Sequence, residues 1–332
     1  MQWDYAFDMG SDSLRTAVRN NPEIETEAAL AAFRRGQETP FAWGDKAYAF
    51  VGREAPGMSI KRCVSGGIPE DISLFAAWVR RKTGVTEKNY MIKRRRVLLA
   101  LSPELDKGRG EPLMNAIREE GIEAVGIVPS DFAAALGADI DVTAPESCFI
   151  LNIGASRISF SAMALGRRVR YRALPYGMEQ ADTLVMESVR SRCGFLIGKR
   201  TARALKQSAY TVKDSTVPGL DMVTGLPAEK TIPAEVVTDA MSEIMADIVK
   251  LVGDCMNGLP VGMSEDIMFK GLVLTGGGNA MDGLSRCISE TLNIPVTRAE
   301  AGGDCTIMGL SRIMAEPGRF APLLLDWQGS VE

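Results

Sequence analysis

The stretch at residues 271–284, GLVLTGGGNAMDGL, constrains the fold more than any other part of the sequence. Its apolar run at residues 272–274 is typical of a buried strand, and a helical pattern resumes after four turn residues: Gly276, Gly277, Gly278 and Asn279. Glycine lets a backbone approach a ligand closely, and a strand, a glycine turn and a helix start together place N–H groups at the mouth of a nucleotide site. A tight strand-to-helix turn without a ligand explains the same residues, so this stretch alone leaves both interpretations open.

Composition excludes several classes of protein. The chain has 332 residues, enough for two domains, with 46% hydrophobic and 24% charged residues as in ordinary globular proteins. Its net charge of −4 gives no electrostatic support for binding nucleic acid. The absence of histidine excludes histidine-based catalysis, and the six cysteines form no CxxC pair, which argues against a zinc site. Without a secretory signal, or an apolar run near the roughly 18 residues of a membrane span, the sequence predicts a cytoplasmic protein with reduced thiols.

A second glycine turn lies near the start of the sequence. An apolar strand around residues 5–7 runs into Asp8, Met9, Gly10 and Ser11, and residues 14–18 form the returning strand of a hairpin. A carboxylate such as Asp8 at a strand end can hold a hydrated Mg²⁺, while Ser11 and nearby N–H groups can face phosphate oxygens. For so short a motif the simpler interpretation, a hairpin whose turn Asp8 caps, is favoured.

The same succession of strand, glycine turn and hairpin recurs about half a chain later. An apolar strand at residues 149–152 enters the turn Gly154-Ala155-Ser156-Arg157, and residues 158–165 and 168–174 form the hairpin. This weak internal symmetry predicts a duplicated α/β domain with a cleft between the two copies.

A basic segment, KNYMIKRRR at residues 88–96, precedes an apolar strand at residues 97–101. Its three apolar side chains, Tyr90, Met91 and Ile92, are ringed by five basic ones that include Lys93 and Arg94. This arrangement suits insertion at an anionic membrane surface, with each basic residue adding roughly 1 kcal/mol. A solvated charged loop is an equally supported interpretation.

The remaining pattern predicts a helix that ends near Gly84 and another that starts at Pro233. It also predicts a small insertion at residues 22–60 that includes a strand-like piece at residues 48–51. Residues 208–233 lack a regular pattern and are expected to be irregular, and the helix at residues 132–136 is expected to have one of two N-caps: Ser130 or Asp131.

These turns, with several further segments, make the chain similar over nearly its whole length to the MreB family of bacterial actins. The matching segments are residues 8–11, 67–71, 196–198, 200–202 with Lys206, 223–227, 271–284 and 294–296, of which VTGLP at 223–227 is close to diagnostic. The resemblance implies a two-lobed α/β actin-like fold, a duplicated ribonuclease-H-like topology that binds ATP or ADP with Mg²⁺ in the interlobe cleft. It also implies filaments, and it favours the membrane interpretation because Tyr90, Met91 and Ile92 coincide with the family's hydrophobic loop.

Carried over residue by residue, the resemblance assigns the metal to Asp8 and the membrane contact to Tyr90, Met91, Ile92, Lys93 and Arg94. The nucleotide-binding residues that it implies are Asp8, Gly10, Ser11, Gly154, Ser156, Arg157, Gly177, Arg203, Lys206, Gly276, Gly277, Gly278 and Asn279. Lobe I would span residues 1–143, with residues 310–332 packing back on it. Lobe II would span residues 144–309, with a small subdomain at about 178–265.

The chain departs from the family's pattern at the residues that matter for hydrolysis. Asn152 stands where the family has an aspartate that helps hold the metal and its water, and Ser130 stands at the catalytic glutamate. Serine cannot act as a carboxylate base, so we expect turnover to be suppressed by several orders of magnitude. Arg157 replaces a threonine and is expected to contact the γ-phosphate as a fixed positive charge. Three further departures change the charge around the nucleotide: Asp12, Lys199 and Arg203.

The sequence therefore predicts a cytoskeletal MreB-like actin at the inner face of the cell membrane, which acts in cell shape or in positioning wall synthesis. It would bind adenine nucleotide with weak or absent hydrolysis. Its partners would be copies of itself or an MreB paralogue, the anionic membrane and a wall-synthesis complex. Two alternatives stay open: an active ATPase of the same fold, which phosphate release distinguishes, and a non-polymerising adaptor for a true MreB, which pelleting distinguishes.

Overall fold

The computed structural model describes residues 2–86, 95–207, 213–281 and 283–325. The chain divides into two compact units, Met1–Asp141 with Asp304–Glu332 (unit 1) and Val142–Gly303 (unit 2). Among the described residues, no helix combines the length and the apolar character that crossing a membrane requires.

Unit 1 is built on a five-stranded sheet with the order β10-β9-β1-β2-β3. The strands are β1 (Tyr5–Met9), β2 (Ser13–Val18), β3 (Ile24–Ala28), β9 (Arg95–Leu101) and β10 (Ile122–Pro129). β1, β9 and β10 are parallel, whereas β2 returns antiparallel to β1 and β3 antiparallel to β2. The predicted hairpin around the first glycine turn is therefore confirmed.

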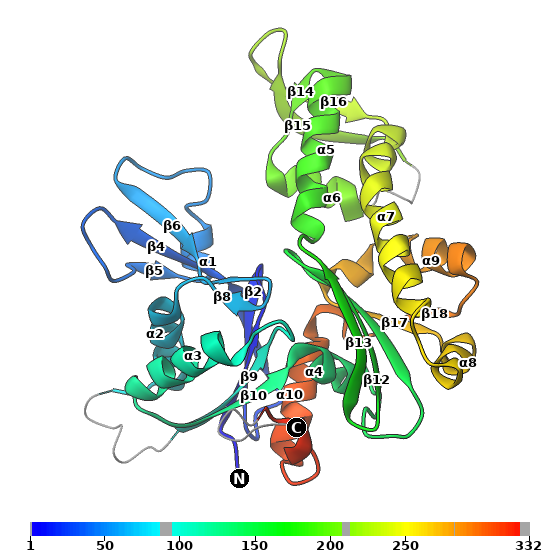
Figure 1. Ribbon diagram of the computed structural model, residues 1–332. Coiled ribbons are helices and arrows are strands. Elements are labelled where there is room, and N and C mark those ends of the chain that lie inside the picture. Colours follow the sequence, from blue (N-terminus) through cyan, green and yellow to red (C-terminus); the bar gives the residue numbers. More distant parts are fainter. Residues whose placement is uncertain (1, 87–94, 208–212, 282, 326–332) are drawn as a thin grey trace. The chain divides into compact units, whose positions relative to one another are not determined.

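Helices cover both faces of this sheet (Figure 1): α2 (Ile72–Thr83), α3 (Lys107–Glu119), α4 (Ser130–Gly137) and α10 (Cys305–Ala315). Val97, Leu99 and Leu101 of β9 share a core with α2 and α3. α4 and α10 pack against each other and against β9, and Leu98 on the opposite face of that strand is also buried. Because successive strand side chains point to opposite faces, a strand covered on both faces is apolar at consecutive positions.

The ends of two helices test the expected caps. α2 ends at Gly84, which adopts the left-handed conformation with φ 63°, as the sequence predicts. The N-cap of α4 is Pro129, without a side-chain cap, so the expectation of Ser130 or Asp131 was wrong. The helix starts at Ser130, two residues earlier than expected, and the buried Asp131 carboxylate accepts the N–H of its neighbour Phe132.

The insertion in unit 1 consists of β4 (Leu30–Arg34), β5 (Ala42–Trp43), α1 (Asp45–Tyr48) and β6 (Met58–Arg62), followed by the short pair β7 (Val64–Ser65) and β8 (Ile68–Pro69). The expected strand-like piece at residues 48–51 was wrong. The N–H groups of Tyr48 and Ala49 bond back to the carbonyls of Gly44 and Asp45, so local helical bonds replace strand pairing there.

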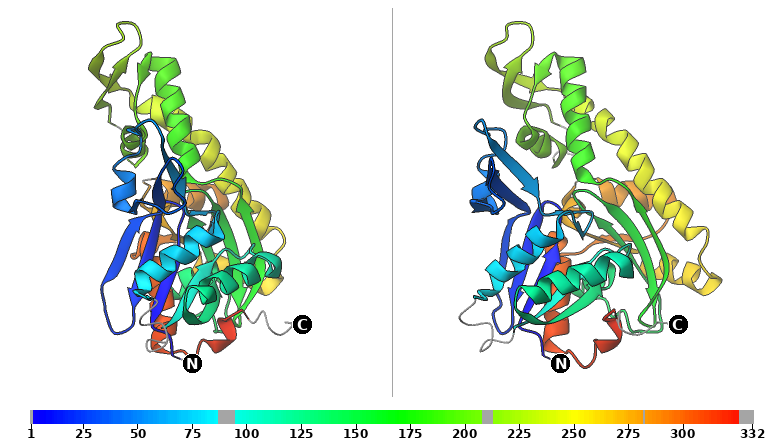
Figure 2. Two further views of the ribbon diagram at one scale, coloured as in Figure 1. Left: turned by 90° about the vertical axis from the view of Figure 1, so that its left-hand side faces the viewer. Right: turned by 60° about the vertical axis from the view of Figure 1, so that its left-hand side comes forward.

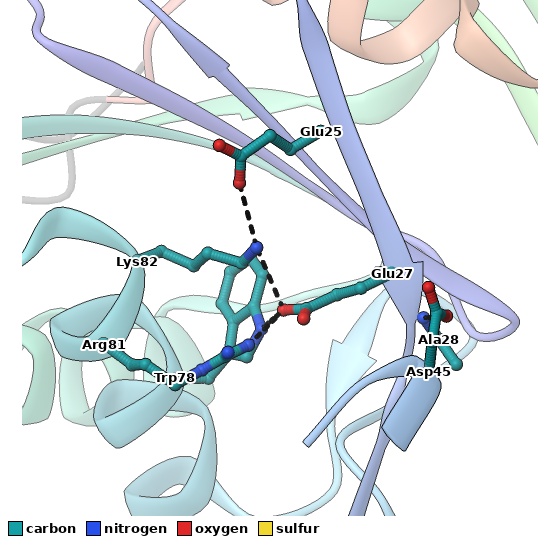
Figure 3. A network of polar contacts seen from close by, with 7 residues as sticks. All are labelled: Glu25, Glu27, Ala28, Asp45, Trp78, Arg81 and Lys82. Carbon is teal, nitrogen blue, oxygen red and sulfur yellow. Dashed lines mark hydrogen bonds and ion pairs between the residues drawn. The ribbon is translucent and has the colours of Figure 1, made fainter. Parts of the chain in front are cut away.

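A polar network joins β3 to α2 in unit 1 (Figure 3). Glu27 accepts hydrogen bonds from the Trp78 indole and the Arg81 guanidinium, and the Lys82 ammonium lies 3.3 Å from the same carboxylate. Lys82 also pairs with Glu25 at 3.1 Å. Although burial raises the pKa of Glu27, the hydrogen bonds from Arg81 and Trp78 and the charges of Arg81 and Lys82 hold it below its ordinary value of 4.5. The network therefore favours an ionised Glu27.

Unit 2 repeats the topology of unit 1. Its five-stranded sheet has the order β13-β12-β11-β17-β18, with β11, β17 and β18 parallel and β12 and β13 antiparallel. The strands are β11 (Cys148–Ile153), β12 (Ile158–Ala164), β13 (Arg167–Leu174), β17 (Leu272–Thr275) and β18 (Val296–Arg298). The two sheets correspond strand by strand, which confirms the predicted duplication.

Unit 2 contains four longer helices: α5 (Met178–Cys193), α7 (Ala234–Met256), α8 (Val261–Lys270) and α9 (Leu284–Leu292). The long α7 (yellow in Figure 2) packs against α5, β12 and β13. The smaller elements are α6 (Lys199–Gln207), β14 (Phe195–Leu196), β15 (Ser215–Asp221), β16 (Pro227–Ile232) and the 3₁₀ turns η1 (Gly277–Ala280), η2 (Gly302–Asp304, at the junction with unit 1) and η3 (Ala321–Leu323, in unit 1). The expectation of an irregular stretch at residues 208–233 was wrong from Ser215 onward, because β15 and β16 form an antiparallel hairpin there.

Candidate functional site

The first glycine turn, in unit 1, follows β1. Asp8 and Arg15 are partners in the register of β1 and β2, and the Arg15 Nη1 lies 3.6 Å from the Asp8 Oδ2. The Arg15 Nε also donates to the Asp304 Oδ1 at 2.6 Å. Burial raises the pKa of the Asp8 carboxyl to about 6, because desolvation outweighs the lowering by Arg15 and the charge of Asp304 adds to the rise. The carboxylate predicted to hold metal is thus buried beside a fixed cation.

The turn residues Gly10 and Ser11 are fixed by the backbone around them. A Cβ on Gly10 would lie 2.5 Å from the carbonyl oxygen of Ser13, so only glycine fits this close approach. The Ser11 Oγ accepts a hydrogen bond of 2.9 Å from the N–H of Gly66. The neighbouring Asp12 is exposed. The hydroxyl expected to face phosphate therefore also holds the loop that follows β7.

The second glycine turn, in unit 2, packs on the start of α5. The Gly154 N–H donates to the carbonyl of Arg157 at 2.8 Å, which closes the turn, and Ser156 and Arg157 are half-buried in it. The N–H groups of Met178 and Glu179 bond to the carbonyls of Gly154 and Ala155 at 3.0 and 2.8 Å. The first N–H groups of α5 are therefore used to hold this turn.

Gly177 and the third glycine turn complete the arrangement in unit 2. A Cβ on Gly177 would lie 2.5 Å from the Arg157 nitrogen and from the Gly154 oxygen. Gly276 has φ 82°, and a Cβ on Gly278 would lie 3.0 Å from the carbonyl oxygen of Ile153. Three segments distant in the sequence thus meet at contact distances that leave no room for larger residues.

Asn279 and Thr275 border this third turn. The Asn279 amide donates to the carbonyls of Leu274 and Ala299 at 3.3 and 3.0 Å, so its side chain holds the turn. Thr275 is fully buried, and its Oγ1 has no hydrogen-bond partner among the described residues. Gly277 is exposed, with open space where a Cβ would stand. The exposed backbone of Gly277 is the part of the turn that a ligand can reach.

Lys206 and Arg203, on α6, are paired with an acid on α5. The Lys206 ammonium lies 2.5 Å from the Asp182 carboxylate and donates to the Met178 carbonyl at 2.7 Å. Arg203 lies 3.7 Å from the same carboxylate. The side chains of Lys206 and Asp182 are 8% and 1% exposed, so this ion pair is buried beside the second glycine turn.

The structure thus groups the candidate residues unit by unit. Asp8, Gly10 and Ser11 lie together in unit 1; Gly154, Ser156, Arg157, Gly177, Arg203, Lys206, Gly276, Gly277, Gly278 and Asn279 lie in unit 2. The candidate membrane residues Tyr90, Met91, Ile92, Lys93 and Arg94 fall outside the described residues. Of the basic residues next to them, Arg96 pairs with Glu123 at 2.9 Å and Arg95 lies over the Tyr5 ring.

Sequence reasoning missed four residues that the structure brings to these turns: Arg15, Thr275, Asp182 and Asp304. Arg15 left a signal, because a hairpin closed around Gly10 pairs it with Asp8. Thr275 directly precedes the third glycine turn in the sequence. Asp182 and Asp304 depend on contacts between elements that the sequence does not specify.

The sequence model of the family described as MreB/Mbl protein matches residues 2–321. The chain belongs to the MreB/Mbl family. It is 24% identical over 312 residues to the cell shape-determining protein Mbl of Bacillus subtilis (strain 168), covering 92% of this chain and 94% of that protein. It is also 24% identical over 317 residues to the cell shape-determining protein MreB of Escherichia coli (strain K12), covering 92% and 91% of the two chains.

Solved structures establish the fold of this MreB/Mbl-family chain. The crystal structure of MreB5 of Spiroplasma citri bound to ADP matches with a TM-score of 0.88 at 23% identity, covering 96% of this chain and 97% of that one. The MamK double helical filament matches with a TM-score of 0.77 at 15% identity, covering 94% and 99%. The fold is actin-like, as the sequence predicts.

Proposed function

We propose that this MreB/Mbl-family chain binds ATP or ADP. The observation that carries the proposal is the convergence of Gly154, Gly177, Gly276 and Gly278 in unit 2, where each of these four glycines is required by a close backbone contact. Such a surface offers little side-chain bulk to a phosphate group, and the exposed backbone of Gly277 is the part open to it. The relatives from Spiroplasma citri, described as bound to ADP and to AMPPNP, support this assignment. That Mg²⁺ accompanies the nucleotide at Asp8 stays a prediction and is considered below with Arg15.

We propose further that the chain hydrolyses nucleotide weakly or not at all. Asn152 is the last but one residue of β11 and lies beside the third glycine turn, where an aspartate would supply the negative charge that holds a metal and its water. Ser130 opens α4, and its hydroxyl cannot act as a general base in place of a carboxylate. An active ATPase of the same fold is the alternative, and phosphate release distinguishes the two.

Self-assembly into filaments is the second part of the proposal. Val223 and Leu226, at the tip of the β15–β16 hairpin, are 91% and 63% exposed, and Phe269 on α8 is 86% exposed. The hairpin tip and α8 lie at opposite ends of unit 2 (Figure 1). The Asp221 carboxylate accepts the N–H of Val223 at 2.9 Å, so the tip is held in place. Exposed apolar patches at two ends of one unit suit head-to-tail contact with a second copy.

The cellular role that we propose is in cell shape, with the filament at the inner face of the membrane and in contact with wall synthesis. The proposal is supported by the names of relatives such as Mbl and MreB, which are called cell shape-determining. A membrane contact would use residues 88–94, whose sequence combines apolar and basic side chains. A non-polymerising adaptor for another MreB-family protein is the alternative.

The test combines three measurements on the purified protein. Denaturation releases any bound nucleotide for identification, titration with labelled ATP gives the affinity, and pelleting with and without ATP detects filaments. We expect bound or bindable adenine nucleotide, little phosphate release and a pellet that grows with protein concentration. Absence of binding at millimolar ATP would overturn the nucleotide proposal. A protein that pellets only with a conventional MreB would support the adaptor instead.

A further inference from the structure

The cation at the first glycine turn is a side chain of this chain. Arg15 faces Asp8 across the β1–β2 register, and its Nη1 lies 3.6 Å from the Asp8 Oδ2. The same Nη1 lies 3.7 Å from the position that a Cβ on Gly10 would occupy, so the guanidinium rests against the turn itself. The contact with Asp304 at 2.6 Å fixes the other edge of the guanidinium. Arg15 is therefore held over the turn from two sides.

The residues of this turn do not fit a divalent cation. Mg²⁺ requires oxygen ligands in near-octahedral geometry, most often one or two carboxylates with water and phosphate oxygens. Asp8 is the carboxylate in question, and it is already opposite a guanidinium whose charge would repel the metal. In unit 2, residue 152 is an asparagine, so its side chain is a neutral amide and not a carboxylate that could support the metal.

We propose that Arg15 takes the place of the divalent cation at this turn, so that the chain binds adenine nucleotide without Mg²⁺. The proposal rests on the nucleotide binding proposed above and adds the identity of the group that neutralises the phosphates. Asp8 and Asp304 then act as positioning residues, because each holds one edge of the guanidinium.

The chemistry of arginine suits this role. The guanidinium stays charged at any physiological pH and has five N–H donors in a planar fork that matches phosphate oxygens. The contacts with Asp8 and Asp304 involve Nη1 and Nε of the guanidinium, and 17% of the Arg15 side chain is exposed to solvent. A charge-assisted, bidentate contact with phosphate is among the stronger hydrogen-bonding arrangements in proteins. Arg15 can thus bind phosphate while it remains paired with the acids.

The experiment compares ATP affinity with Mg²⁺ and with EDTA, using labelled ATP and the full chain. We expect the affinity of the parent to agree within about threefold in the two media. Arg15→Gln keeps a polar side chain but removes the charge, so we expect its affinity in EDTA to fall about tenfold or more. Arg19→Gln is the matched control, since Arg19 pairs with Asp4 at 3.3 Å beyond the end of β2 and away from the turn.

Three results would overturn the inference. If the parent binds ATP tightly with Mg²⁺ and its affinity falls tenfold or more in EDTA, a metal at Asp8 and not Arg15 neutralises the phosphates. The nucleotide proposal would still stand. An Arg15→Gln variant that binds like the parent in EDTA would remove Arg15 from the site. Absence of binding in both media would overturn the proposed function together with this inference. The comparison on the parent needs no variant, so it stands even if Arg15→Gln fails to fold.

Discussion

Asn152 and Thr275 are partners in the parallel register of β11 and β17, where Thr275 is the last residue of β17 and Asn152 the last but one of β11. The Asn152 Oδ1 lies so close to Gly276 that a Cβ there would collide with it. Residue 152 therefore sits against the third glycine turn, and the only chemical difference from an aspartate at this point is one amide nitrogen in place of a carboxylate oxygen. A change of charge here acts directly on the turn.

The double variant Asn152→Asp with Ser130→Glu is expected to hydrolyse ATP faster than the parent. The two substitutions supply the negative charge that supports a metal and the carboxylate that orients the attacking water. A positioned general base contributes about 10²-fold or more, so steady-state phosphate release should rise by at least that factor in the presence of Mg²⁺.

Asn257→Asp is the control for this variant, because it makes the same change at an exposed residue after α7. It should leave phosphate release unchanged. If the double variant releases phosphate no faster than the parent, loss of the two carboxylates is not the reason for weak hydrolysis.

Much of the fold follows from the sequence because the central strands of both sheets are buried at consecutive positions. Strands such as β9 and β11 are apolar at consecutive positions, β11 runs directly into the glycine turn at Gly154, and this pattern is visible in the sequence alone. The β15–β16 hairpin was missed because it contains Pro218 and Gly219 and has few fully buried side chains, so its alternation of half-buried and exposed residues is faint in the sequence.

The candidate site was predictable only as far as its backbone. Glycines in the sequence indicate close approaches of the backbone, and the structure has such approaches in the three glycine turns, for example at Gly10, Gly154 and Gly276. Side-chain pairing across elements is different: Lys206 is buried by Asp182 on another helix, and Arg15 is fixed by Asp304 far along the chain. Such contacts depend on how helices pack, which local patterns do not encode.

Glu27→Gln should lower stability at neutral pH. The ionised carboxylate accepts a hydrogen bond from the Trp78 indole and pairs with Arg81 and Lys82. Hydrogen bonds to a charged group are stronger than those to a neutral one, so we expect urea unfolding to show a loss of about 1–2 kcal/mol in the free energy of unfolding. The pKa of Glu27 is lowered, so its contribution is complete above 4.5 and is lost as the pH falls through the folded-state value. The gap between variant and parent should therefore close on acidification.

Glu25→Gln is the matched control for this pH profile. Its side chain is 59% exposed and pairs with Lys82 alone, so the change should cost no more than about 0.5 kcal/mol. Equal losses for the two variants would contradict a central role for Glu27.

Lys206→Met should be strongly destabilising, because it leaves the buried Asp182 with Arg203 as its remaining partner at 3.7 Å. Breaking a buried pair by removing one member costs about 3–5 kcal/mol, whereas replacing both members by apolar residues costs far less. Urea unfolding should therefore show that Asp182→Leu partly restores the stability of Lys206→Met. A double variant less stable than the single one would contradict this account of the pair.

Val223→Ser with Leu226→Ser should weaken self-assembly without unfolding the chain. Both side chains are exposed at the hairpin tip, so their loss costs little in the isolated molecule but removes apolar contact with a second copy. Light scattering should show the critical concentration rising about tenfold or more. Val51→Ser, at an exposed valine of unit 1, should assemble like the parent. Unchanged assembly of the double variant would exclude the hairpin tip from the filament contact.

Tyr90→Ser with Met91→Ser should reduce cosedimentation with anionic liposomes. The segment at residues 88–96 carries three apolar and five basic side chains, which would act together: the basic residues draw it to anionic lipid, and the apolar ones insert. Binding of the parent should therefore fall with added salt, which screens exposed charges, and should be weak on neutral vesicles. Tyr48→Ser, at an exposed tyrosine elsewhere in unit 1, should bind like the parent. If the double variant sediments as well as the parent at low salt, membrane binding does not depend on insertion of Tyr90 and Met91.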